Sequence, residues 1–114
     1  MAIIHIIFFR VPSSITPAEE KALCDGVLSL KSACRLPSGE SYILSITGGR
    51  DRSNAKFPYQ KGFTHAFVFK FKSVADRDYY MEADRTHMEF LKAGEKWIKD
   101  EDVAVMDFEE ELSY

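Results

Sequence analysis

Three histidines, each within an apolar segment, are the side chains of this sequence best suited to chemistry. His5 stands in "AIIHIIFF", His65 in "GFTHAFVFKF" and His87 in "RTHMEF". An imidazole titrates near neutral pH and takes protons from carbon or oxygen, which suits enolate chemistry. The hydroxyl of Tyr80 adds a donor that can stabilise a carbonyl oxygen as it becomes anionic. These four side chains are our candidate catalytic residues.

The pairing of His87 with Tyr80 depends on the shape of the helix between them. We predict that His87 acts as the base and that Tyr80 orients the substrate oxygen. Residues seven apart in an unbroken helix lie roughly 10 Å apart along its axis, so contact between the two requires a break. Asp84 is a favourable cap for a second helix and would allow one. On its helix, His87 shares an apolar stripe with Ala83, Phe90, Leu91 and Gly94.

Each of these side chains also has a structural interpretation. A lone buried histidine is most often a neutral core residue hydrogen-bonded to the backbone, and Tyr80 has the alternative role of a core tyrosine. Three histidines with Asp107 or Asp84 could hold zinc or iron, but no pair of histidines has ligand spacing. Neither Cys24 nor Cys34 has a nearby histidine to activate it as a nucleophile. We therefore predict neither a metal nor another cofactor.

Composition narrows the class of protein. The 114 residues fit one domain spanning 1–114, and a hydrophobic fraction of 46% is enough for a core. A formal net charge of −3 without a basic cluster argues against a nucleic-acid partner. The longest apolar run has roughly eight residues, too few to span a bilayer, so no membrane segment is expected. Cys24 and Cys34 lie about 15 Å apart on one predicted helix, and two such unpaired thiols indicate the cytoplasm.

Hydrophobic periodicity predicts four strands and two helical regions. The expected strands are 2–10, 42–49, 63–71 and 102–108, followed by an acidic tail at 109–114. The first helix begins at the capping box "TPAE" and ends near "RLPSGE", and the second helical region runs from 73 to about 99. The order β-α-β-β-α-β fits a ferredoxin-like α+β fold with an antiparallel four-stranded sheet in the order 4-1-3-2. Both helical regions would then cover one face of that sheet.

The two central strands of this sheet are apolar on both faces. The strand at 63–71 has one face made of Phe63, His65, Phe67, Phe69 and Phe71. His5 lies on the corresponding face of the first strand, so we expect His5 and His65 to point into the same cavity. Since the helices cover only one face, a second copy of the chain is the economical cover for the other. The pattern therefore predicts a homodimer with two sheets packed face to face.

Several segments together resemble the stress-responsive A/B barrel family, also called Dabb or dimeric α/β barrel proteins. The matching pieces are His5 in the first strand, "SITGG", "GFTHAF", "SVADRDYY", the histidine and phenylalanine of "HMEF", and "VMDF". No piece is specific alone, but their order and spacing cover nearly the whole chain. The version found here resembles fungal members most. The resemblance implies a dimer in which two four-stranded sheets form a barrel.

One plant member of this family is a polyketide cyclase, which closes a linear poly-β-keto thioester by an aldol step. It is similar in placing histidines at the positions of His5, His65 and His87 and a tyrosine at that of Tyr80. Its pocket tyrosine on the first helix falls at Val27 here. One extra residue separates Tyr80 from His87 compared with the plant pattern, and the family's proline before the last histidine is replaced in "ADRTH".

Two functions remain open from the sequence. The first is a cofactor-free, cyclase-like lyase with an apolar pocket, lined by Val27, Phe67, Phe69 and Phe90, for a small aromatic or polyketide-like ligand. The second is a non-catalytic dimeric stress-response or small-ligand-binding protein. An open cavity reached by the histidines favours the enzyme, whereas a cavity filled by side chains such as Met88 favours the second. Phe57 and Tyr59, in the polar loop 50–61, are candidates for a lid or for packing on the surface.

Overall fold

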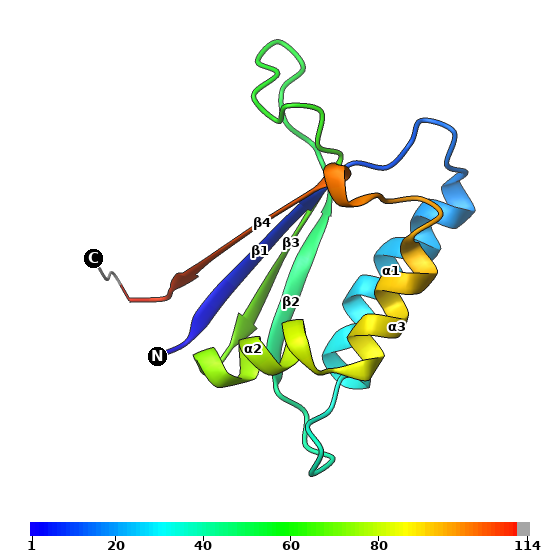
Figure 1. Ribbon diagram of the computed structural model, residues 1–114. Helices are drawn as coiled ribbons and strands as arrows, with labels where there is room; N and C mark the ends of the chain where they lie inside the picture. Colours follow the sequence, from blue (N-terminus) through cyan, green and yellow to red (C-terminus); the bar gives the residue numbers. More distant parts are fainter. Residues whose placement is uncertain (112–114) are drawn as a thin grey trace.

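One antiparallel sheet of four strands, covered on one face by three α-helices, forms the fold (Figure 1). The computed structural model describes residues 1–111, so the last part of the predicted tail, 112–114, lies outside the described residues. Along the chain the elements are β1 (Ile3–Phe9), α1 (Pro17–Ala33), β2 (Ile43–Arg50), β3 (His65–Phe71), α2 (Val74–Glu82), α3 (Arg85–Gly94), a 3₁₀ turn (Asp100–Asp102) and β4 (Val103–Glu109). The spatial order β2-β3-β1-β4 confirms the predicted topology.

The register of β1 decides which side chains meet on the helical side of the sheet. β1 lies between β3 and β4 and is antiparallel to both. His5 stands opposite Phe69 on β3 and opposite Asp107 on β4, while His65 stands opposite Phe9. Directly opposed residues point to the same face of a sheet. His5 and His65 therefore share the face that the helices cover, as the alternation of the sequence predicted, and both are buried.

Helix α1 begins and packs as its sequence predicts. The hydroxyl of Thr16 accepts the N–H of Glu19, and the Glu19 carboxylate accepts the N–H of Thr16, which completes the capping box. The apolar stripe Leu23, Val27 and Leu30 is buried against the sheet, and the buried Cys34 follows the last helical residue. Among residues 1–111, no helix is both long and apolar enough to cross a bilayer.

The second helical region is divided into α2 and α3 rather than continuous. Ser73 caps α2 by accepting the N–H of Asp76. Asp84 caps α3, since its carboxylate accepts the backbone N–H groups of Thr86 at 2.8 Å and His87 at 3.3 Å. The break that the sequence allowed at Asp84 is therefore present, and it is what brings His87 back toward Tyr80.

The face of the sheet opposite the helices is apolar but uncovered within one chain. Met106 is 69% exposed, Phe108 49% and Phe8 38%. Phe63, predicted to lie on the face of His65, instead packs its ring on Phe8 with centroids 5.8 Å apart, on the opposite face. The prediction for Phe63 was wrong because β3 begins at His65, and strand alternation does not extend to residues before the strand.

Candidate active site

A cavity of about 480 Å³ lies between the sheet and helices α1 and α3. Its polar side chains include His5, Tyr80 and His87, all of them buried. Most of the remaining lining is apolar, and the half-exposed side chains Met81, Leu91 and Val105 mark where it opens to solvent. This volume and this mixture of apolar walls with a few polar groups are typical of a small-molecule site. Three of the predicted pocket residues, Val27, Phe69 and Phe90, line it.

His5 is held by a carboxylate from the neighbouring edge strand. Its Nδ1 lies 2.7 Å from Oδ1 of Asp107. Because an ionised carboxylate only accepts hydrogen bonds, Nδ1 carries the hydrogen and Nε2 is left as the acceptor. The second oxygen of Asp107 accepts a hydrogen bond from the guanidinium of Arg77 on α2. Burial lowers the pKa of His5, and Asp107 opposes part of that lowering. The neutral imidazole is thus oriented as a proton acceptor.

His87 owes its orientation to the break between α2 and α3. Its Nδ1 donates to the carbonyl oxygen of Tyr80 at 2.8 Å. In a continuous helix that carbonyl would accept from the N–H of Asp84, but the Asp84 N–H donates to the carbonyl of Tyr79 instead. The imidazole of His87 therefore takes the place of a backbone donor. Burial lowers the pKa of His87, so the neutral ring keeps Nε2 free to accept a proton.

Tyr80 touches both histidines through its ring. It stacks on His87 with centroids 3.7 Å apart and an interplanar angle of 16°, and it meets His5 edge-on at 5.9 Å. Contact between Tyr80 and His87, which the sequence left open, is therefore present, although it is made by the ring and the backbone carbonyl. Burial raises the pKa of the Tyr80 hydroxyl. A phenol held in its neutral form remains a hydrogen-bond donor.

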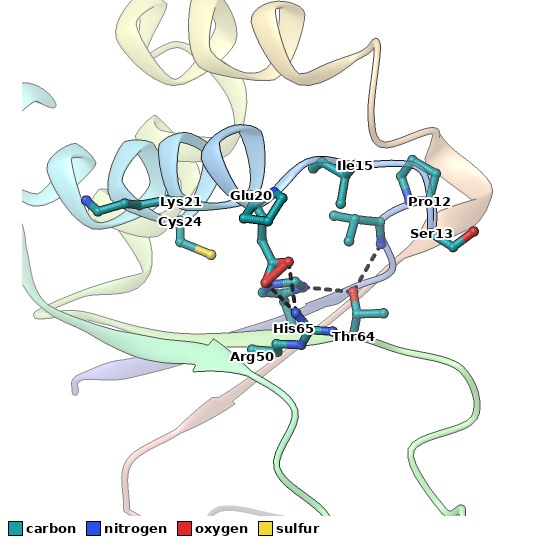
Figure 2. A pocket seen from close by; sticks show the side chains of 11 residues that line it. Pro12, Ser13, Ile15, Glu20, Lys21, Cys24, Arg50, Thr64 and His65 are labelled. Atoms are coloured by element: carbon teal, nitrogen blue, oxygen red, sulfur yellow. Dashed lines mark hydrogen bonds and ion pairs between the residues drawn. The ribbon is translucent and has the colours of Figure 1, made fainter.

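His65 lies in a different place from the one predicted. It lines a separate pocket of about 490 Å³ between the start of α1 and the end of β2 (Figure 2). Its Nδ1 is 2.8 Å from the hydroxyl of Thr64, and its Nε2 is 3.5 Å from the Glu20 carboxylate, which also pairs with Arg50 at 3.0 Å. Phe9 separates His65 from the cavity of His5, because the Phe9 ring lines that cavity and stacks on His65 at 5.1 Å.

The expectation that His5 and His65 share a cavity is therefore wrong. Alternation along a strand predicts the face of a side chain but not its distance from a second one on that face. The predicted pocket residue Phe67 is also absent from the cavity, because its fully buried ring stacks on Phe9 at 5.9 Å. Phe57 and Tyr59 are exposed in a loop that projects beyond the end of the sheet, and neither lines the cavity (Figure 1).

Two residues of the site were missed by sequence reasoning. The sequence pattern suggests Asp107 only as a metal ligand and indicates no role for Arg77. A signal for Asp107 was present, since it is the one charged residue within the otherwise apolar "VAVMDF" and alternates with Val103 and Val105. Arg77 gives no such signal, because its contact with Asp107 spans 30 residues. Within residues 1–111, no group of three histidine, cysteine or acidic side chains is arranged to hold a metal ion.

The sequence and the fold are similar to those of known proteins. The model of the stress responsive A/B barrel domain family matches residues 3–110. None of the curated proteins matches the sequence. Among solved structures, the protein At3g17210 from Arabidopsis thaliana is 20% identical, with a TM-score of 0.78 over 98% of both chains.

Two further solved structures are similar. Hydroxynitrile lyase from Passiflora edulis is 22% identical, with a TM-score of 0.77 over 98% of this chain and 97% of that one. A dimeric ferredoxin-like protein of unknown function from Jannaschia sp. CCS1 is 14% identical, with a TM-score of 0.71 over 96% and 99%. At these identities the similarity demonstrates the ferredoxin-like fold alone.

Proposed function

The chain belongs to the stress responsive A/B barrel domain family, and from this premise we propose that it is a cofactor-free, lyase-type enzyme. The reaction makes or breaks a carbon–carbon bond beside a carbonyl group by proton transfer at His5 and His87. One observation carries the proposal. Both imidazoles commit their Nδ1 hydrogen to a fixed acceptor and line one apolar cavity, so each has Nε2 available to a ligand.

The proposed chemistry uses only side chains of the cavity. Nε2 of one histidine takes a proton from the carbon beside a carbonyl group, and the Tyr80 hydroxyl donates a hydrogen bond to the oxygen that becomes anionic. The resulting carbanion attacks a second carbonyl carbon of the same substrate, and the imidazolium returns its proton to the new alkoxide. The apolar walls limit the access of water and favour a partly planar substrate with little charge.

His5 and His87 differ in how well they can hold a proton. Asp107 stabilises an imidazolium at His5, as the aspartate does in serine hydrolases, whereas His87 has only a backbone carbonyl. Two titratable groups in unlike surroundings are the usual basis for dividing acid and base roles. We therefore propose His5 as the base that takes the proton and His87 and Tyr80 as further contacts of the substrate, whereas the sequence had favoured His87 as the base.

The substrate class is proposed from the cavity and the family resemblance together. A polyketide-like β-dicarbonyl compound suits two proton acceptors between apolar walls, in agreement with the resemblance to the plant cyclase. The Passiflora protein is a hydroxynitrile lyase by name, and cyanohydrin cleavage likewise breaks a carbon–carbon bond after removal of a proton. The likeness to fungal members and to the plant cyclase remains a prediction from sequence motifs.

We also propose that the protein is a homodimer formed through the uncovered face of its sheet. The exposed Met106, Phe108 and Phe8 lie on that face, and a similar structure is described as dimeric. Light scattering on the purified protein tests this, with Met106→Glu expected to give a monomer.

The unpaired Cys24 and Cys34 support a reducing compartment, which we take to be the cytoplasm. We also treat residues 1–114 as one domain.

The alternative function is a non-catalytic, ligand-binding member of the family, and the predominance of apolar side chains in the cavity favours it. One experiment separates the two. The protein is incubated with a linear poly-β-keto thioester and, separately, with an aromatic cyanohydrin, and products are followed by mass spectrometry. Turnover that His87→Ala reduces by about 100-fold or more supports the enzyme. Saturable binding of either compound without turnover supports the alternative.

A further inference from the structure

Asp107 bridges two cationic or potentially cationic side chains, one with each of its oxygens. Oδ1 accepts from Nδ1 of His5 at 2.7 Å, and Oδ2 accepts from Nη1 of Arg77. The guanidinium of Arg77 is itself held on its other edge, where Nε donates to Asp78 at 2.8 Å. The side chains of Arg77 and Asp107 are 23% and 21% exposed. A connected series of hydrogen bonds therefore runs from Asp78, on the surface of α2, to His5 in the cavity.

We propose that Arg77 is a positioning residue, which fixes Asp107 against His5 and keeps the cavity-facing nitrogen of His5 free of a proton. The proposal rests on the proposed function only in giving His5 a role in proton transfer. Arg77 does not line the cavity, so its effect on His5 passes through Asp107.

The geometry gives Arg77 two effects on His5. A carboxylate with one partner can rotate, whereas the planar guanidinium pins the second oxygen and so fixes the direction of the first. The Nδ1 hydrogen of His5 then always has its acceptor, and Nε2 remains the acceptor that faces a ligand. In addition, the permanent charge of Arg77 neutralises part of the charge of Asp107. Without it, the full negative charge of Asp107 would favour the imidazolium of His5.

The other groups around His5 do not replace Arg77 in this role. His5 packs against Tyr80 of α2, and the charge of His5 also affects His87 of α3, which is neutral near pH 7 because of its burial. Asp78 is negative and acts on Arg77 rather than on His5 directly. Consistent with this arrangement, Asp107 raises the pKa of His5 and Arg77 lowers it, although burial has the largest effect. Arg77 is thus the cation that offsets Asp107.

A second set of a histidine, a carboxylate and an arginine in the same protein provides a matched control. Arg50 pairs with Glu20, and Glu20 approaches His65, in the same order as Arg77, Asp107 and His5. Arg50 does not line the cavity, and its side chain is 62% exposed. Replacing Arg50 removes the same charge from the same protein, but next to a different histidine.

The test is an NMR titration of the histidine ring signals in three full-length proteins without any substrate. These are the wild type, Arg77→Gln and Arg50→Gln. Arg77→Gln should shift the His5 midpoint upward and mix the two neutral ring tautomers seen in ¹⁵N spectra, while Arg77→Lys restores part of the wild-type midpoint. Arg50→Gln should leave His5 unchanged. An unchanged His5 midpoint in Arg77→Gln, or an equal shift in Arg50→Gln, would overturn the proposal.

A second variant keeps the test decisive if Arg77→Gln does not fold. Asp78 is 48% exposed and outside the core, so Asp78→Asn should fold normally. This variant leaves the charge of Arg77 less neutralised and should shift the His5 midpoint downward; no shift counts against the proposal. None of these results depends on turnover. A protein without activity but with the expected shifts would refute the proposed enzyme and leave the role of Arg77 intact.

Discussion

Two sets of side chains, each made of a histidine, a carboxylate and an arginine, lie on the same face of the sheet. They differ in how closely the histidine approaches its carboxylate. In the first, Nδ1 of His5 is 2.7 Å from Asp107, and the imidazole lines the apolar cavity. In the second, Nε2 of His65 is 3.5 Å from Glu20, beyond hydrogen-bond distance, and the imidazole lines another pocket. An imidazole, a carboxylate and a guanidinium thus form an oriented proton acceptor in one place and a loose contact between α1 and the sheet in the other.

The difference follows from what supplies each carboxylate. Asp107 comes from β4, a strand directly paired with β1, so backbone hydrogen bonds fix its distance from His5. Glu20 comes from α1, which packs across the sheet at the distance its side chains allow. A neighbouring strand therefore sets a polar contact more tightly than a packed helix does. We expect this geometric difference to be a functional one as well.

Alanine substitutions of the two histidines should give the largest contrast. His5→Ala removes the proton acceptor from the cavity, so we expect turnover to fall by about 100-fold or more. Because His65 lies on the other side of Phe9 from the cavity, His65→Ala should leave turnover nearly unchanged, although the sequence alone predicts His65 in the site. Steady-state rates measured on folded variants decide between these outcomes. Equal losses in the two variants would erase the distinction.

Substitution of the two carboxylates should give a smaller contrast. In Asp107→Asn the amide can donate to Nδ1 of His5, which moves the ring hydrogen to Nε2 and removes the proton acceptor. We expect turnover to fall by about tenfold or more, in the same direction as the larger loss, about 10⁴-fold, that the comparable change causes in a serine protease triad. Glu20→Gln should alter neither turnover nor the His5 tautomer. Rates together with ¹⁵N spectra of the rings measure both effects; a His5 ring that keeps its hydrogen on Nδ1 in Asp107→Asn contradicts the assignment.

The two sets of side chains should affect the pH dependence of stability in the same way. Burial lowers the pKa of both His5 and His65 from 6.5, so below that pH the unfolded chain binds protons that the folded chain does not. The free energy of unfolding should therefore decrease as the pH falls below about 6.5 and level off above it. His5→Gln and His65→Gln should each make this decrease shallower. Urea unfolding across that pH range is the measurement, and an unaltered slope in either variant would show that the replaced histidine takes up its proton equally in the folded and the unfolded chain.

The smallest effect should come from replacing Arg50, the exposed member of the second set. Arg50→Gln breaks an ion pair whose arginine is 62% exposed, so we expect the free energy of unfolding to change by at most about 1 kcal/mol. Urea unfolding at neutral pH measures it. A loss of several kcal/mol would mean that Arg50, Glu20 and His65 act as one tightly coupled unit, contrary to the 3.5 Å separation.

The sequence predicted the arrangement of elements better than the contacts within the site. Strand order, the cap at Asp84 and the inward faces of His5 and His65 all follow from periodicity and local capping, which act over a few residues. The partners of His5 do not, since Asp107 and Arg77 depend on the register of β1 with β4 and on where α2 packs. Phe9 shows the same limit, because its place between His5 and His65 is a property of the packed core.

The interruption between α2 and α3 has a consequence for how related sequences should be read. His87 meets Tyr80 through a carbonyl released by the end of one helix and through a stacked ring, so the contact does not rely on the 3.6-residue repeat. A residue gained or lost in the turn around Asp84 can therefore leave the pair in place. The extra residue that the resemblance to the plant cyclase implies between Tyr80 and His87 would be tolerated in this way.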